Sequence, residues 1–578
     1  MAQELLIPND SKHNVVSYQV LINGQVANPS YELLSLTVTR EMNRVPSARI
    51  VFKDGDPATK TFAVSEQNDF VPGTPIAVKL GRDGTNDQVF KGIIVKHAIR
   101  IKEGGHSELT VECKDEVVRM TVGRHSKYYE KEKDSELIDT MVRSYANLTC
   151  NMQTTTLQYE ELVQHHCSDW DFMLMRAEAN GMLVSVVDGK VNIAVPQTGT
   201  TPALQVAFGS SILEFEAEID ARTQWKNVEA HSWDYHNQAL FTADASGISG
   251  WKEAGNIPTA TLAQTINLNN YEMHHSGYLK EQELQTWVEG LMRRSLLAKI
   301  CGRAKCTGFS KITPGDMITV SGVGARFSGN IFVTAVRQEA GNGMWDTHIQ
   351  FGLDGRRYAE LYADIGDVQA AGLVSGIRGL QIGITVKLEG DPEGQDRIQV
   401  RLPMVDNNAD GIWTRVASLD AGNNRGAFFR PEIGDEVIVG FINDDPGEAV
   451  VLGMLNSSAK PAPLTAQNSN DLKGFTTRSK MHISFDDGQS TISIDTPNNK
   501  IFLDEPNGKV SISDKNKNSI TLDSSGITLT SATGDININA TAGNVNLSGG
   551  KGFAAKGLTA GLTGDTTVTI KGTTVAIN

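Results

Sequence analysis

A mainly β fold with several domains is predicted by three features of this 578-residue sequence. Glycine, with 55 residues, exceeds its usual share of about 7% and favours a chain with many turns. Short segments that alternate apolar and polar residues recur along most of the chain. Helix-like patterns are confined to the part before residue 350. We therefore expect an N-terminal α+β region followed by domains built from strands.

The N-terminal region, residues 1–365, is expected to hold two barrel-like subdomains with inserted helices. Alternating segments such as SARIVFKDG and TPIAVKLG predict its strands. Helices are predicted at 134–147, 168–181 and 277–302, where Ser168 stands as an N-cap. The longest helix presents an apolar stripe that we expect to be buried, made of Leu284, Trp287, Val288, Leu291 and Leu296.

A Gly- and Ala-rich linker is expected at residues 366–380, before a small barrel at 381–458. The second segment contains five β runs in about 75 residues, separated by turn clusters such as DNNADG and NDDPGE. That spacing is typical of a five-stranded barrel. Its Trp413 and the pair Phe428-Phe429 are predicted to lie in the core. Residues 459–477 are expected to form a second linker, or neck.

Charge and cysteine content narrow the range of functions. The net charge of −15 argues against nucleic acid as a partner, because phosphate binding needs a basic surface. The first residues lack the basic and apolar parts of a signal peptide, and no run of 18 apolar residues predicts a membrane span. Five irregularly spaced cysteines are expected to be reduced core residues of a protein made in the cytoplasm.

Residues 478–578 form a repeat of short bursts such as TISID and GITLT, with the order polar, apolar, any residue, apolar, polar. Two buried side chains per burst contribute about 1.5–3 kcal/mol each. Ordering the backbone costs about 1–2 kcal/mol for each residue, so one layer of such strands cannot stand alone. The region must close on itself as a solenoid or wrap with copies of itself, and the short repeat favours an intertwined homotrimer.

The apolar residues of the bursts are predicted to face the axis of this trimer. They are Ile492, Ile494, Ile501, Leu503, Val510, Ile512, Ile520, Leu522, Ile527, Leu529, Ile536, Ile538, Val545, Leu547, Val568 and Ile570.

Landmarks in the small barrel resemble the OB-fold signature of VgrG proteins, the spike proteins of type VI secretion and related contractile injection systems. They include Trp413-Thr-Arg415-Val416, Phe428-Phe429-Arg430-Pro431, Gly434-Asp435-Glu436-Val437 and Asp445-Pro446-Gly447. Residues 167–183, 312–322 and 344–353 resemble the hub domain of the same family, which is similar to phage tail-hub proteins. Residues 481–497 resemble the start of its needle.

The resemblance implies a structural spike without catalytic, cofactor-binding or metal sites. The hub, residues 1–365, is expected to seat on the inner tube and baseplate of the particle as a homotrimer. Residues 478–578 are expected to form a trimeric β-helix needle that is pushed through a target envelope. The protein is expected to be assembled into the particle and delivered outside the bacterial cell or into a target cell. A PAAR-type tip protein is expected to cover the end at Val575, Ile577 and Asn578, and effector cargo is a further expected partner.

The alternative is a trimeric β-helical tailspike enzyme that acts on surface polysaccharide. Such a site needs a pair of carboxylates in a groove with aromatic platforms, whereas the repeat holds only Phe485, Phe502 and Phe553. Asp486 and Asp487 are adjacent and are expected to point to opposite faces of a strand. The histidine pairs in QHHCSD and MHHSG are interpreted as ordinary polar positions. A carbohydrate-binding adhesin would leave the hub unexplained.

Overall fold

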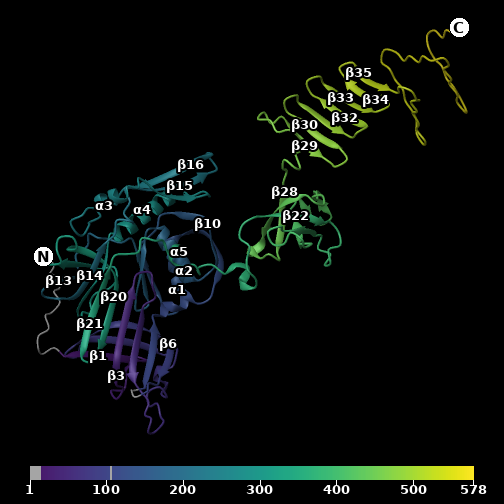
Figure 1. Cartoon of the computed structure of the whole chain (residues 1–578). Helices are drawn as coiled ribbons and strands as arrows, with labels where there is room; N and C mark the ends of the chain where they lie inside the picture. Colours follow the sequence, from purple (N-terminus) through teal and green to yellow (C-terminus); the bar gives the residue numbers. More distant parts are fainter. Residues whose placement is uncertain (1–14, 104–106, 578) are drawn as a thin grey trace. The chain divides into compact units, whose positions relative to one another are not determined.

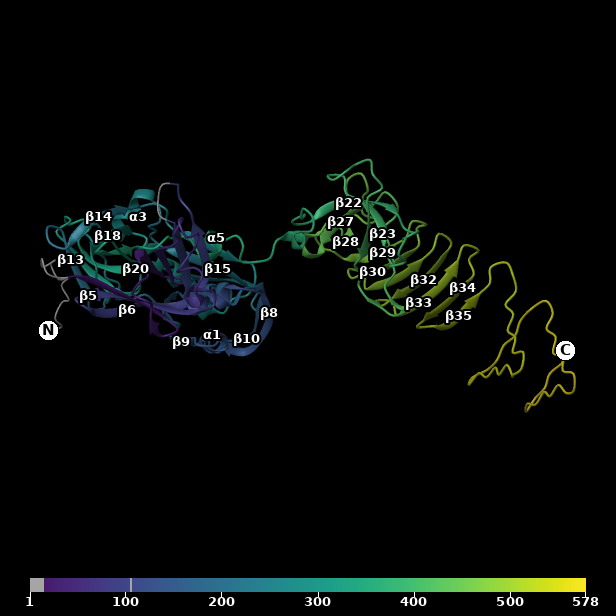
Figure 2. The same cartoon turned by 90° about the horizontal axis from the view of Figure 1, so that it is seen from below.

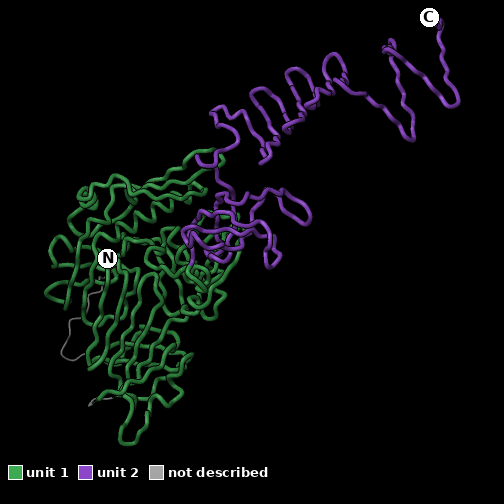
Figure 3. The backbone as a smooth tube through the Cα atoms, turned by 45° about the vertical axis from the view of Figure 1, so that its right-hand side comes forward, with its two compact units in different colours: residues 1–375 green, residues 376–578 purple. Residues whose placement is uncertain are grey.

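The computed structural model describes residues 15–103 and 107–577 and divides the chain into two compact units, residues 1–375 and 376–578 (Figures 1 and 3). Both units consist mainly of strands, and all five α-helices of the described residues lie in the first unit. The predicted mainly β fold with some helices is therefore confirmed. No helix in the described parts of the chain is long and apolar enough to span a membrane.

One sheet of thirteen strands organises the first unit. Its first seven strands come from the start of the chain: β1 (Val16–Ile22), β2 (Gln25–Val26), β3 (Leu33–Glu41), β4 (Ser47–Lys53), β5 (Pro75–Arg82), β6 (Thr85–Arg100) and β7 (Glu108–Lys114). The others follow much later: β13 (Leu204–Ala207), β14 (Ile212–Ile219), β18 (Ile300–Thr307), β19 (Met317–Ser321), β20 (Gly329–Gly341) and β21 (Met344–Phe351).

The two groups of strands are joined by β3 and β20, which lie far apart in the sequence. The order is β14-β18-β21-β20-β3-β4-β7-β6-β5-β1-β2, and β13 joins through β19, which pairs with β20. Antiparallel pairing of β20 with β3 runs from Ala335 beside Glu41 to Ala340 beside Leu36. One continuous sheet therefore carries two hydrophobic cores, one around Phe52 and Phe90 and one around Val333 and Phe351.

Helices and small sheets fill the rest of the first unit. The helices are α1 (Asp134–Arg143), α2 (Asp169–Ala179), α3 (Thr259–Ile266), α4 (Glu281–Leu297) and α5 (Tyr358–Leu361). A two-stranded ribbon is formed by β8 (His125–Lys133) and β10 (Gln158–Cys167). The three-stranded sheets consist of β9 (Thr149–Met152), β11 (Leu183–Val187) and β12 (Lys190–Ala194), and of β15 (Val228–Asp234), β16 (Ala239–Ala245) and β17 (Tyr271–His275).

The helix predictions near residues 134, 168 and 277 are confirmed by α1, α2 and α4. Ser168 caps α2 by accepting a hydrogen bond from the backbone N–H of Asp171 at 3.1 Å. The predicted stripe of α4 packs against the sheet that contains β15, with Leu284, Val288 and Leu291 buried. The helices α3 and α5 were not predicted, because each is short and lacks a helix-spaced apolar run.

A closed barrel of five strands begins the second unit and confirms the prediction made from the turn clusters. It consists of β22 (Gln381–Lys387), β23 (Ile398–Arg401), β24 (Ile412–Val416), β27 (Glu436–Phe441) and β28 (Ala449–Met454), with a small hairpin of β25 (Ala421–Gly422) and β26 (Arg425–Gly426). Its core is made of small branched side chains that are almost fully buried, among them Val400, Val437 and Val451.

A seven-stranded sheet follows the barrel (Figure 2). Each strand pairs antiparallel with the next: β29 (Leu472–Thr476), β30 (His482–Asp486), β31 (Thr491–Asp495), β32 (Asn499–Asp504), β33 (Lys509–Asp514), β34 (Ser519–Asp523) and β35 (Gly526–Thr530). The bursts after Thr530 were also predicted to be strands. Within the described residues 531–577, however, none is assigned, so in the single chain these bursts have no ladder partner.

The packing of the first core predicts a large effect for Phe52→Ala. Phe52 is 2% exposed, and its ring centroid lies 4.8 Å from that of Phe70 and 6.1 Å from that of Tyr31. Removing the ring leaves a cavity, so the free energy of unfolding of the first unit is expected to fall by about 3–5 kcal/mol in urea denaturation. The control Tyr128→Ala removes a ring that is 77% exposed and is expected to change it by less than about 0.5 kcal/mol. Equal effects would contradict this assignment of the core.

Candidate functional site

The seven-stranded sheet carries two continuous columns of apolar side chains on one face. Because cross-strand partners share a face and side chains alternate along a strand, the alternating apolar residues of β30 to β35 line up. One column consists of Ile483, Ile494, Ile501, Ile512, Ile520 and Leu529. The other consists of Phe485, Ile492, Leu503, Val510, Leu522 and Ile527. We call these twelve residues the apolar face.

The apolar face is not covered by any described part of the chain. Its side chains are 36–71% exposed, whereas apolar residues of the neighbouring barrel such as Val400 are fully buried. The opposite side of the sheet carries mostly hydroxyl residues, and Ser493 there is only 8% exposed. The apolar side of this sheet is therefore the more open one, the reverse of what a folded monomer needs.

A hollow of about 610 Å³ lies on the apolar face. Its apolar lining comes from one of the two columns and extends past the last strand to Ile536. The hollow is therefore a shallow apolar trough along the sheet rather than a pocket with convergent polar groups.

Aspartate side chains hold the turns between the strands of this sheet. Asp504 accepts hydrogen bonds from the Asn507 side chain, and Asp514 accepts them from the backbone N–H groups of Asn516 and Asn518, each at 2.9 Å. Desolvation alone would raise the pKa of Asp514, but the hydrogen bonds from Asn518 and Asn516 outweigh it and lower the pKa. These turns fix the register that aligns the two columns.

The first strand joins the sheet to the barrel within the second unit. Phe475 of β29 stacks on Phe429 with ring centroids 5.3 Å apart, and Arg478 pairs with Glu432 at 2.9 Å. Gly474 is required here, because a Cβ at this position would lie 2.1 Å from the carbonyl oxygen of Ile483. The register of β29 against β30 therefore depends on a close approach of the two backbones.

The predicted axis residues divide into two groups in the structure. Ten lie on the apolar face, from Ile492 to Leu529. The others lie after β35 and are exposed: Ile536, Ile538, Val545, Leu547, Val568 and Ile570. Val575 and Ile577 are exposed as well, and Asn578 lies outside the described residues. Whether these side chains face a trimer axis or a tip protein stays a prediction.

Sequence reasoning did not place Ile483 and Phe485 among the axis residues, although both belong to the apolar face. The signal was present, because HISFD at 482–486 has the same polar and apolar order as the later bursts.

The barrel also exposes apolar side chains, and here the sequence prediction was wrong. Phe428 and Phe429 were expected in its core, but they are 78% and 58% exposed, because they lie in the loop between β26 and β27. Trp413 is partly exposed. Further exposed side chains on the barrel are Met404, Val405, Leu419 and Ile433.

The residues considered for catalysis have structural partners instead. Asp486 accepts a hydrogen bond from the backbone N–H of Gln489 at 2.9 Å, and Asp487 pairs with Lys473. All five cysteines are free thiols, as predicted, and four are buried while Cys301 is partly exposed. In the parts of the chain that the structure describes, no group of three or more His, Cys, Asp or Glu side chains is arranged to hold a metal ion.

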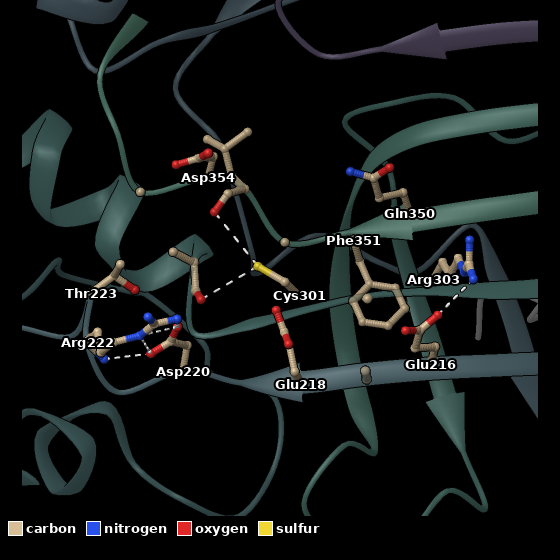
Figure 4. A pocket seen from close by; sticks show the side chains of 16 residues that line it. Glu216, Glu218, Asp220, Arg222, Thr223, Cys301, Arg303, Gln350, Phe351 and Asp354 are labelled. Carbon is tan, nitrogen blue, oxygen red and sulfur yellow. Dashed lines mark hydrogen bonds and ion pairs between the residues drawn. The ribbon is translucent and has the colours of Figure 1, made fainter. Parts of the chain in front are cut away.

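A cavity of about 800 Å³ in the first unit lies beside the edge strand β14 (Figure 4). Four of its charged groups form two ion pairs: Glu216 with Arg303 at 2.8 Å, and Asp220 with Arg222. Burial raises the pKa of the Cys301 thiol to about 11, so the thiol is protonated at neutral pH and is a poor nucleophile.

Two family models match the chain. Residues 12–342, more than half of the chain, match the family described as the Alg8 N-terminal domain. Residues 381–455, which include the five-stranded barrel, match the type VI secretion system/phage-baseplate injector OB domain.

Curated relatives include spike proteins of type VI secretion systems. The chain is 25% identical over 218 residues to the spike protein VgrG1b of Pseudomonas aeruginosa, a match that covers 34% of this chain and 28% of that protein. It is 31% identical over 83 residues to the spike protein VgrG3 of Vibrio cholerae, covering 12% of this chain and 8% of that protein. These matches therefore span well under half the length of either relative.

Solved structures similar to the chain include phage tail and type VI proteins. The 43 kDa tail protein of prophage MuSo2 from Shewanella oneidensis has a TM-score of 0.46 at 9% identity, covering 58% of this chain and 98% of that one. An E. coli component of the type VI secretion system has a TM-score of 0.38 at 13% identity, covering 76% and 100%.

The close approach at Gly474 predicts the effect of Gly474→Ala. The added Cβ has to push β29 away from β30, which is expected to cost about 1–3 kcal/mol and to lower the midpoint of thermal unfolding of the second unit. The matched control is Gly453→Ala in β28, where the nearest atom to the added Cβ, a methyl of Ile438, lies 3.8 Å away. Its thermal midpoint is expected to stay near that of the wild type. A Gly474→Ala variant with an unchanged midpoint would show that the two backbones are not in this register.

Proposed function

Because the chain belongs to the family described as the Alg8 N-terminal domain and is a VgrG-like type VI secretion spike protein, we propose that three copies form the central spike of a contractile injection particle. In this proposal the first unit is the hub that seats on the inner tube and baseplate. The small barrel narrows the spike, and the seven-stranded sheet begins a needle. The observation that carries the proposal is the uncovered apolar face.

Three copies of the sheet can cover one another. If each apolar face turns toward a common axis, the three sheets form the sides of a prism whose interior is filled by the two apolar columns. Each fully buried side chain then contributes about 1.5–3 kcal/mol that the single chain cannot obtain. Two flat sheets packed face to face would also bury these columns, but the homotrimer fits the short repeat and the family.

The exposed apolar residues of the barrel support the same arrangement. Met404, Leu419 and Phe428 are 78–88% exposed, and Phe429 stacks on the first strand of the needle sheet. In the proposed spike these side chains lie between the three barrels and continue the apolar axis upward from the needle. Their exposure in the single chain is then a consequence of a missing partner.

The needle is proposed to have two sections with different strand pairing. Over residues 472–530 each chain has its own antiparallel ladder, so each chain supplies one whole side of the prism. From 531 to 577 no strand is assigned in the described chain, yet the alternating bursts continue. We place their hydrogen-bond partners in the other two chains, which would make this section the intertwined one.

The remaining partners follow from the same proposal. The blunt end at Val575 and Ile577 would receive a PAAR-type tip protein, and the particle would carry effector cargo into a target envelope. The role of the chain is mechanical, as it is a structural spike-hub component. The needle is rigid because a closed prism leaves no lateral strand edge free.

The proposed trimer predicts that one charge on the apolar face is enough to disrupt it. Ile512→Asp places a carboxylate in the axis of the needle and is expected to shift the native mass from about three times 62.6 kDa toward 62.6 kDa in native mass spectrometry. The control Ser511→Asp puts the same charge on the neighbouring residue of β33, which faces the other side of the sheet. It is expected to leave the trimer intact. A wild-type mass of 62.6 kDa would refute the trimer itself.

The two sections of the needle predict different amide exchange after dissociation. In Ile512→Asp monomers, backbone amides of β30–β32 are expected to keep part of their protection, because their ladder is within one chain. Amides of residues 535–548 are expected to lose protection by 100-fold or more, because their partners are other chains. Hydrogen exchange of wild-type trimer and variant measures this directly. Similar losses in both sections would rule out the division.

A further inference from the structure

One face of the sheet formed by β16, β15 and β17 carries an ordered pattern of charged and aromatic side chains. The other face is covered by α4, with Val228, Ala230 and Met273 in the core beneath it. On the central strand β15, residues 229, 231 and 233 belong to the outward face. We call it the outer face of the β15 sheet.

A row of three carboxylates crosses the first part of this face. Glu229 is the direct cross-strand neighbour of Asp244 on β16 and of Glu272 on β17. Glu229 and Glu272 have His231 and His274 within 3.5 Å, and Asn270 donates a hydrogen bond to Glu229. Among the described residues no Lys or Arg forms an ion pair with any of the three.

Repulsion among the three carboxylates destabilises the sheet unless a positive charge offsets it. Like charges directly opposite each other destabilise a sheet, whereas acidic side chains elsewhere in the first unit, such as Glu178 and Glu253, pair with Arg294 and Lys299. The row therefore presents unneutralised negative charge to an incoming molecule.

Exposed aromatic and aliphatic side chains occupy the other end of the same face. Trp233 is 38% exposed, and its cross-strand neighbour Leu240 is 65% exposed. Tyr235 and Tyr278, 66% and 42% exposed, lie beside them with ring centroids 5.4 Å apart. Trp and Tyr are the side chains most enriched among residues that dominate binding energy at protein interfaces.

This end is also held rigidly. Asp234, which is 1% exposed, accepts hydrogen bonds from the backbone N–H of His236 at 2.9 Å and from the Asn237 amide at 2.7 Å. The turn that presents Tyr235 is therefore fixed before any partner arrives. A preformed surface loses less conformational entropy on binding than a mobile one.

We propose that the outer face of the β15 sheet docks a basic protein segment with an apolar anchor. Lysine or arginine side chains of the segment neutralise the carboxylate row, and the anchor packs on Trp233, Leu240 and Tyr235. Glu229 and Trp233 are four residues apart on one strand, which places the two ends roughly 13 Å apart. The segment therefore carries its basic residues about four positions from its anchor when extended. Docking at this face needs only residues of the first unit and does not depend on the proposed trimer.

The test uses the purified full-length chain and two labelled synthetic peptides. The first carries two lysines, a three-residue Gly/Ser spacer and a Trp-Leu pair, and the second has glutamates in place of the lysines. The lysine peptide is expected to bind in fluorescence anisotropy titrations, with affinity falling as salt rises from 50 to 500 mM. The glutamate peptide is expected not to bind. Equal binding of both peptides would overturn the proposal.

Two variants separate the two halves of the surface. Trp233→Ala removes the anchor site, and the combined Glu229→Gln, Asp244→Asn and Glu272→Gln variant removes the charge while keeping the side-chain shapes. Each is expected to weaken the lysine peptide about tenfold, and only the charge variant is expected to lose the salt dependence. Circular dichroism melting checks that both variants fold. Unchanged affinity in either folded variant would contradict the proposal.

The matched control lies on the β8–β10 ribbon. There Glu130 faces Glu161 across the strands, and the exposed Tyr128 stands only two residues from Glu130. The combined Tyr128→Ala, Glu130→Gln and Glu161→Gln variant is expected to keep wild-type affinity, because its spacing is half that of the proposed surface. A tenfold loss in this variant would refute the assigned site.

Two further measurements identify other occupants. A photoreactive benzoylphenylalanine at position 240 in the full chain is expected to give crosslinks to a segment with the stated pattern of charge and anchor. Crosslinks only to a second copy of this chain would assign the face to self-assembly and overturn the proposal.

Titration with zinc chloride is expected to leave peptide binding unchanged. Zinc that binds His231 and His274 and displaces the peptide would assign a cation site instead.

Discussion

The uncovered apolar face of the seven-stranded sheet is the constraint on which the proposed assembly depends. Twelve apolar side chains line up in two columns because the strands alternate with a period of two and the aspartate turns fix their register. No described segment folds back over them. A sheet with one apolar side needs a cover, and in the proposed spike other copies of the chain supply it. Phe428 and Met404 of the barrel are also apolar side chains that stay exposed in the single chain.

The first unit differs from this sheet, because its own described residues bury its hydrophobic cores. The pairing of β20 with β3 joins two groups of strands that lie far apart in the sequence and places two cores on one sheet. Backbone hydrogen bonds between β3 and β20 hold the two groups of strands together. In the same unit, α4 covers one face of the small sheet formed by β15, β16 and β17.

Local patterns predicted the parts of the fold that depend on neighbours in the sequence. The cap at Ser168, the stripe of α4 and the turn clusters of the five-stranded barrel were all confirmed. The helices α3 and α5 were missed because eight and four residues carry too little periodicity. Phe428 and Phe429 were placed in the core because hydrophobicity alone does not distinguish a buried ring from an exposed one.

The sequence by itself determined which residues share a strand and a face, because alternation is a local property of an extended backbone. It therefore identified most of the apolar face, from Ile492 to Leu529, and the family to which the landmarks of the barrel belong. Only the tertiary structure decided which strands become neighbours. It paired β3 with β20, brought Glu229, Asp244 and Glu272 into one row, and left the bursts after Thr530 without a ladder. These outcomes depend on contacts between distant segments, and no local pattern of residues encodes them.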